Sequence, residues 1–148
     1  MTIYDISEKA GVSIATVSRV LNGSSSVSQK TREKVLDVIE RCGYKPNAFA
    51  RGLGLNTMKT IGIMCADSSD LYLAKAIYYI ERKLRASGYD SLLCCTGYGL
   101  ESKAASMNLL LTKKVDGIIL AGSNFVYEKE QENQYIAEAA AQVPVMLL

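Results

Sequence analysis

Residues 10–22 read AGVSIATVSRVLN, and this stretch decides the fold of the first third of the chain. Gly11 permits a tight turn between two helices, and the Ser13 hydroxyl can cap the second helix. The inward face of this stretch is apolar and consists of Val12, Val17 and Val20. The pattern predicts a helix-turn-helix, although small helical hairpins that have no nucleic-acid partner share the same spacing.

The residues around this motif predict a bundle of three short helices, an all-α domain over residues 1–46. The first helix begins after Thr2, with Asp5 as its capping partner, and Gly11 ends it. The second helix spans about Ile14 to Leu21, and the third, capped by Ser28, spans about Gln29 to Arg41 with an apolar stripe of Val35, Leu36, Val38 and Ile39. A short helix over Ala48–Leu53 is expected inside a linker, residues 47–58.

From Lys59 onward, short apolar runs alternate with longer amphipathic stretches, which predicts a parallel α/β fold. The expected strands are Thr60–Ala66, Ser91–Thr96, Gly117–Ala121 and Val143–Leu148. The expected helices are about Leu71–Ser87, Glu101–Lys114 and Lys129–Ala141, the first with Leu73, Ile77, Ile80 and Leu84 on its sheet-facing side. Because the chain stops inside an apolar edge strand, we expect residues 59–148 to be part of a truncated subdomain.

Composition and charge disfavour an enzyme. The chain of 148 residues contains no histidine, which removes the commonest general base and most zinc sites, so we expect no catalytic residues, no metal and no cofactor. Residues 1–58 carry a net charge of +3 and residues 59–148 a net charge of −1, which is a weak indication of nucleic-acid binding at the front. Without a signal peptide or an apolar run of about 20 residues, we expect a cytoplasmic protein that does not span a membrane.

The helix-turn-helix includes the motif Thr-Val-Ser-Arg-Val-Leu-Asn, and three further motifs follow it in order: Val-Ser-Gln-Lys-Thr-Arg-Glu-Lys-Val, Gly-Tyr-Lys-Pro-Asn and Lys59-Thr60-Ile61-Gly62-Ile63. With these motifs the chain resembles the lactose/galactose repressor (LacI/GalR) family, and the resemblance continues through residues 115–120 and 143–145. The resemblance implies a homodimeric repressor that binds double-stranded operator DNA through a helix-turn-helix head and a hinge helix. It also implies that residues 59–148 are the first part of a periplasmic-binding-protein-like subdomain.

By position, the resemblance implies that Ile14, Ala15 and Arg19 read base edges, with Arg19 as a bidentate donor to guanine. Its implied contacts with the DNA backbone are Thr2, Ser13, Thr16, Ser18, Asn22, Ser28, Thr31, Tyr44 and Asn47. In the hinge, Ala50 and Leu53 are expected in the minor groove, with Leu53 as an apolar wedge between base steps. Ile14 and Ala15 are less polar than the residues that many members carry, which favours contact with thymine methyl groups.

The ends of the first and third strands carry polar residues at the edge where open α/β sheets bind ligands. The resemblance makes five of them candidates for an effector pocket: Asp67, Ser68, Asp70, Tyr72 and Ser123. Full-length relatives are expected to bind a sugar-like or nucleoside-like effector between two subdomains. Residues 59–148 supply one side of such a cleft, and one side does not bury a ligand.

Competing interpretations remain open at this point. A solute-binding α/β protein with structural N-terminal helices would explain the second half, and Asp67 and Asp116 near strand ends keep an enzyme in consideration. Gly97-Tyr98-Gly99 is a poor dinucleotide fingerprint because Ser102 stands where a third glycine is required. Cys94 and Cys95 would point to opposite faces of a strand, which favours core packing over redox chemistry.

Overall fold

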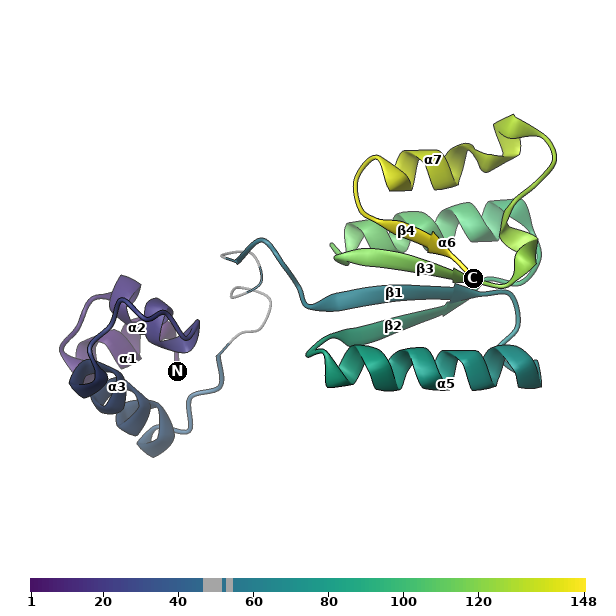
Figure 1. Ribbon diagram of the computed structural model, residues 1–148. Coiled ribbons are helices and arrows are strands. Elements are labelled where there is room, and N and C mark those ends of the chain that lie inside the picture. The colour runs from purple at the N-terminus through teal and green to yellow at the C-terminus, as the bar shows by residue number, and fades with distance from the viewer. Residues whose placement is uncertain (47–51, 53–54) are drawn as a thin grey trace. The chain divides into compact units, whose positions relative to one another are not determined.

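The computed structural model describes residues 1–46, 52 and 55–148, and the chain divides into two compact units, Met1–Leu55 and Asn56–Leu148 (Figure 1). The first unit contains helices α1 (Ile3–Ala10), α2 (Ile14–Leu21) and α3 (Gln29–Arg41). These three helices confirm the expected ones. The finer division, with a hinge over residues 47–58, stays a prediction because much of that segment lies outside the described residues.

Local hydrogen bonds explain where these helices begin and end. The Thr2 N–H donates to Asp5 Oδ2 at 2.7 Å, and the Ser13 and Ser28 hydroxyls accept from the backbone N–H groups of Thr16 and Thr31 at 3.2 and 3.3 Å. Each bond satisfies a backbone or cap group that the first turn of a helix leaves unpaired. Gly11 ends α1 with a φ of +57°, a conformation that costs glycine little.

The core of the first unit is small and apolar. Its buried members come from all three helices: Ile6, Ala10, Val17, Val20 and Val35. The expected stripe on α3 is only partly confirmed, because Val38 and Ile39 pack against this core while Leu36 is 47% exposed. Val17 and Val20 hold the inner side of α2 in the core, so the opposite side of α2 faces solvent.

The second unit is a four-stranded parallel sheet in the order β2-β1-β3-β4. Its strands are β1 (Thr60–Cys65), β2 (Asp90–Cys95), β3 (Gly117–Ala121) and β4 (Val145–Leu147). Helix α5 (Leu71–Ala86) covers one face, and α6 (Leu100–Thr112) and α7 (Gln134–Ala140) cover the other (Figure 1). The expected α/β architecture is therefore present, with β3 at the predicted bounds.

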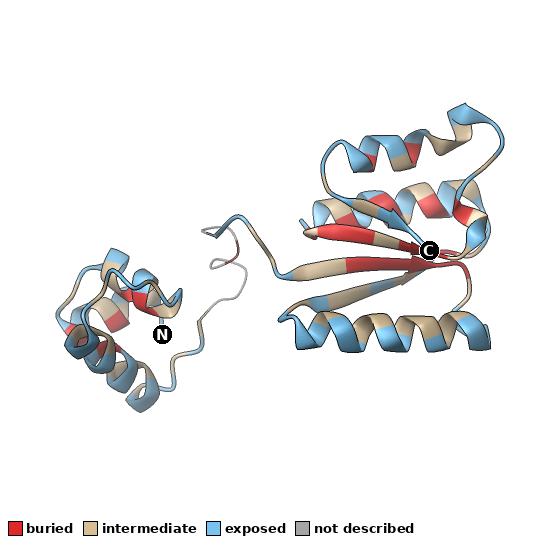
Figure 2. Cartoon of the chain, in the orientation of Figure 1, coloured by how far each residue is buried: buried red, intermediate tan, exposed pale blue. Residues whose placement is uncertain are grey.

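The two faces of the sheet are packed unequally. The main core lies between the sheet and α6 and α7, and it includes Met64, Met107, Leu110, Ile118 and Leu120. On the other face, no residue of α5 is fully buried; the predicted side chains Leu73, Ile77, Ile80 and Leu84 are half-buried (Figure 2). The central strands β1 and β3 are buried on both faces, as their continuous apolar runs predict.

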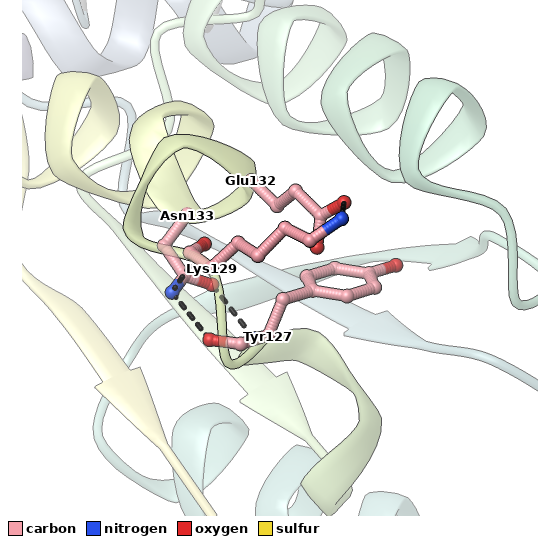
Figure 3. A network of polar contacts seen from close by, with 4 residues as sticks. All are labelled: Tyr127, Lys129, Glu132 and Asn133. Carbon is pink, nitrogen blue, oxygen red and sulfur yellow. Dashed lines mark hydrogen bonds and ion pairs between the residues drawn. The ribbon is translucent and has the colours of Figure 1, made fainter.

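The segment between β3 and β4 differs from the single helix expected over residues 129–141. A 3-10 helix covers Glu130–Asn133 and α7 begins only at Gln134. The Asn133 side chain accepts from the Tyr127 N–H at 2.8 Å and donates to the Tyr127 carbonyl at 2.7 Å (Figure 3). This double hydrogen bond closes a loop where a regular helix would otherwise start.

Two further differences concern residues 122–148. An additional 3-10 turn spans Ser123–Phe125. Strand β4 begins later than expected, because the Val143 N–H is still bonded to the Ala139 carbonyl and Pro144 has no N–H to donate. Lys103 of α6 stabilises the loop after β3. Its side chain is buried, and its amine donates to the Asn124 carbonyl and, at 2.8 Å, to the Tyr127 hydroxyl.

Candidate nucleic-acid interface

The outward face of α2 gathers the side chains predicted to read bases. Ile14 is 39% exposed, Ala15 and Arg19 are exposed, and Ser18 lies half-buried beside them. Ala15 and Arg19 are four residues apart, so they lie one above the other on the same side of the helix. The structure therefore brings the three predicted base-reading residues to one solvent-facing surface.

The guanidinium of Arg19 has no hydrogen-bonding or ion-pair partner among the residues that the structure describes. Two other arginines of the first unit differ in this respect. Arg32 donates to the Ser24 carbonyl, and Arg41 pairs with Asp37 at 2.9 Å. The five N–H donors of Arg19 therefore remain available to a partner outside the chain.

Helices α2 and α3 begin with the same arrangement of two hydroxyls. Ser13 Oγ lies 2.9 Å from Thr16 Oγ1, and Ser28 Oγ lies 2.9 Å from Thr31 Oγ1. Neither helix has an acidic residue in its first turn. A helix N-terminus with exposed hydroxyls and without carboxylates favours an anion, so both ends are chemically suited to phosphate.

The other residues that are predicted to contact the DNA backbone differ in their surroundings. Thr2 is exposed but engaged with Asp5, and the exposed Asn22 donates to Ser18 Oγ at 3.5 Å. Tyr44 is half-buried and packs against the core of the first unit, so it supports that core as well. Asn47, Ala50 and Leu53 lie outside the described residues.

Sequence reasoning did not single out two exposed side chains of the first unit. Tyr4 is 67% exposed on the first turn of α1, next to Thr2. The amine of Lys34 lies 3.6 Å from the point where a Cβ on Gly11 would stand, so it extends toward the turn between α1 and α2. Periodicity along α1 would have placed Tyr4 outside, because Ile6 and Ala10 define the buried side.

The two acidic candidates for an effector pocket have local partners. Asp67 Oδ1 accepts from the Ser69 hydroxyl at 2.7 Å and from its N–H at 2.8 Å, and these hydrogen bonds lower the pKa of Asp67. Asp70 Oδ1 accepts from the Leu73 N–H at 2.9 Å and caps α5. Both carboxylates therefore shape the loop after β1, whatever else they bind.

The remaining candidates are exposed: Ser68 in the loop after β1, Tyr72 in the first turn of α5, and Ser123 at the start of the 3-10 turn after β3. These loops are neighbours: a Cβ on Gly122 would stand 3.6 Å from Asn124 Oδ1 and 3.7 Å from a Leu73 methyl group. Asn124 Oδ1 is buried and has no hydrogen-bond partner among the residues that the structure describes. Sequence reasoning gave Asn124 no separate role, and only the folded packing shows its unsatisfied oxygen.

A pocket of about 590 Å³ lies where the second 3-10 helix meets α7. It is lined by Lys129, Glu130, Gln131, Asn133, Gln134 and Ala137, and Figure 3 shows the polar contacts next to it. None of the five effector candidates lines it. Within the described ranges, no three metal-ligating side chains cluster, and no helix is long and apolar enough to cross a membrane.

Comparison with known families agrees with this geometry. The family model "Bacterial regulatory proteins, lacI family" matches residues 2–47, and "Periplasmic binding proteins and sugar binding domain of LacI family" matches residues 58–145. The chain belongs to the LacI family. The α/β unit thus corresponds to the family's binding-protein-like subdomain, and the three-helix unit corresponds to its helix-turn-helix head.

Two relatives with similar sequences carry the names of regulatory proteins. An HTH-type transcriptional regulator of Lachnoclostridium phytofermentans is 62% identical over 148 residues, which are 100% of this chain and 44% of the relative. Catabolite control protein A of Priestia megaterium is 40% identical over 132 residues, 89% of this chain and 40% of that protein.

Solved structures of the LacI family share the fold. The lac repressor dimer bound to operator and the anti-inducer ONPF has a TM-score of 0.84 and 29% identity, covering 99% of this chain and 44% of that one. A LacI-family transcriptional regulator from Silicibacter pomeroyi has a TM-score of 0.76 at 28% identity, covering 99% and 43%. The chain thus spans less than half the length of these four relatives.

Proposed function

We propose that this chain provides sequence-specific DNA binding and part of the effector-sensing subdomain of a LacI-family transcriptional repressor. The single observation that carries the proposal is the outward face of α2, where Arg19 is exposed and unpaired among the described residues. A short helix held by its buried valines and presenting small side chains fits the major groove. Regulatory action without catalysis, in the cytoplasm where the DNA lies, is part of this proposal.

Each predicted contact has a separate role in the proposed complex. Arg19 donates to the O6 and N7 acceptors of a guanine, while Ile14 and Ala15 contact thymine methyl groups. The hydroxyl pairs at the N-termini of α2 and α3 bind phosphates and fix the register of the helix on the duplex. Ala50 and Leu53 of the hinge enter the minor groove, which is the proposed basis of DNA bending.

The proposed active form is a homodimer, which places two recognition helices on two half-sites. Its support in the second unit is α5, whose solvent side carries Leu71, Tyr78 and Tyr79, each at least 55% exposed. Large apolar side chains gathered on one helix are typical of a buried interface. The lac repressor, a structural relative, is a dimer in the structure named above.

The proposed effector is a sugar-like or nucleoside-like molecule, bound at the carboxyl edge of the sheet by Asp67, Ser68, Asp70, Tyr72 and Ser123. The support is positional, because open α/β sheets bind ligands at this edge and the matching family model describes a sugar-binding domain. Binding would favour one of two arrangements of the subdomain and thereby change how the two hinges are placed on DNA.

Fluorescence anisotropy of the full chain with labelled double-stranded DNA of mixed sequence tests the proposal. We expect binding that weakens steeply between two salt concentrations, because phosphate contacts release counterions. Arg41→Ala is the matched control for Arg19→Ala, since Arg41 is an exposed arginine of the same unit that already pairs with Asp37. It should leave this binding largely unchanged. Binding that is absent at low salt would favour a solute-binding protein with structural N-terminal helices.

A further inference from the structure

The carboxyl ends of β1 and β2 place two cysteines side by side. Cys65 and Cys95 are register partners on these parallel strands, and their sulfur atoms lie 3.8 Å apart. Cys94, although adjacent to Cys95 in sequence, faces the opposite side of the sheet, where it packs against the main core. The pairing therefore joins residues 30 positions apart, and the adjacent pair Cys94 and Cys95 is separated, as alternation along a strand requires.

The two thiols differ in their access to solvent. Cys65 is completely buried, whereas Cys95 is exposed, contrary to the expectation that the cysteines pack in the core. Burial and the neighbouring Cys95 raise the pKa of the Cys65 thiol to about 12, so Cys65 stays protonated at neutral pH. Because Cys95 is exposed and Cys65 is buried, a dissolved oxidant reacts with Cys95 first, and Cys65 is the second thiol to react.

We propose that Cys65 and Cys95 form a modification site at which a hydroperoxide converts the two thiols into a reversible disulfide between β1 and β2. Hydrogen peroxide transfers one oxygen to Cys95, giving a sulfenic acid and water. The Cys65 sulfur then displaces the hydroxyl from Cys95, and the thiol proton leaves with that hydroxyl as a second water. The two thiols lose two protons and two electrons in total, and a thiol reductant reverses the change.

The backbone at this position suits the bond. Adjacent strands lie about 4.8 Å apart, which falls inside the Cα separations of about 4.4–6.8 Å that disulfides span. The sulfurs must approach from 3.8 Å to about 2.05 Å, a distance that side-chain rotation covers. The site also lies directly before the strand-end loops: Thr96 N–H donates to the Cys65 carbonyl, and Gly97 N–H donates to the Ala66 carbonyl.

The test treats the reduced full chain with hydrogen peroxide, then denatures it, alkylates the remaining thiols with N-ethylmaleimide and identifies the peptides by mass spectrometry. We expect two of the four cysteines to escape alkylation, a peptide pair linked through Cys65 and Cys95, and full recovery after dithiothreitol. The matched control is Cys94→Ser, which removes the neighbouring thiol on the other face and should leave the link intact.

Two variants separate the steps. In Cys65→Ser, Cys95 should stop at the sulfenic acid, which dimedone traps. In Cys95→Ser, the change is on the surface, so the fold is retained, and Cys65 should remain alkylatable after peroxide and denaturation. Four alkylatable thiols after peroxide treatment of the parent chain, a Cys94 to Cys95 link or a disulfide between two chains would overturn the proposal.

Discussion

Leu110 of α6 packs directly on the backbone of Gly62 in β1. A Cβ on Gly62 would stand 2.7 Å from Leu110 Cδ1, closer than such atoms approach one another in proteins, and 3.0 Å from Leu110 Cδ2. Leu110 is completely buried in the main core, so it has little room to move. Glycine at position 62 thus allows α6 to approach the central strand of the sheet.

Gly62→Ala should therefore destabilise the α/β unit by about 1–3 kcal/mol, the usual cost of overpacking a filled core. Chemical denaturation followed by circular dichroism measures the change. Gly99→Ala is the matched control, because a Cβ at position 99 would meet only the Ser102 hydroxyl, at 3.3 Å, and that side chain is exposed. Equal losses in the two variants would contradict the assigned role of Leu110.

Arg19→Ala should weaken binding to the correct operator by about 1–3 kcal/mol and binding to random DNA much less, if Arg19 reads a base. Ser18→Ala and Asn22→Ala should weaken both kinds of binding alike, because phosphate contacts carry no sequence information. Anisotropy titrations on the two DNAs measure this difference. A loss for Arg19→Ala that is the same on both would assign Arg19 to the DNA backbone.

Leu53→Ala should reduce the bend of the operator while the three-helix unit stays folded, if Leu53 acts as a minor-groove wedge. Circular permutation gel shifts report the bend, and circular dichroism of the variant reports the fold. An unchanged bend with full affinity would mean that residues 47–54 serve as a tether only.

The capping box of α1 should make the first unit less stable in acid. Hydrogen bonds from Thr2 lower the pKa of Asp5 below its ordinary 3.8, so folding favours the ionised carboxylate. The stabilisation is present above pH 3.8 and is lost as pH falls through the lower pKa of the folded state. A carboxyl titration by NMR should give a pKa below 3.8 for Asp5, and a value at or above it would refute the assignment.

Tyr135 should make the second unit less stable in alkali. Burial raises the pKa of Tyr135 from 10.0 to about 12, and its hydroxyl donates to the Phe125 carbonyl at 2.6 Å. Folding thus favours the neutral phenol, and this contribution is lost as pH rises from 10 toward 12. Denaturation midpoints should fall over that range less steeply in Tyr135→Phe than in the parent chain. Identical slopes would show that other groups cause the loss.

The candidate DNA-binding face could be predicted because helical periodicity and caps are local properties. Ser13 and Ser28 are followed by the helices that their hydroxyls cap, and Val17 and Val20 determine which side of α2 is buried. The central strands β1 and β3 could also be predicted from local sequence, because each is a short continuous apolar segment, which indicates a strand buried on both faces. The break before α7 was missed because it depends on a side-chain bond from Asn133 to the Tyr127 backbone.

The amino-acid sequence by itself determined the family resemblance, because motifs along the whole chain carry it. It also determined the three helices of the first unit and which residues of α2 face outward, because caps and helical periodicity depend on neighbours within a few positions. The tertiary structure alone decided which distant residues meet. Strand register brings Cys65 to Cys95, close packing sets Leu110 on Gly62, and the loop after β3 buries the amine of Lys103. These contacts join positions 21 to 48 residues apart, and only the register of the sheet and the packing of its helices specify them.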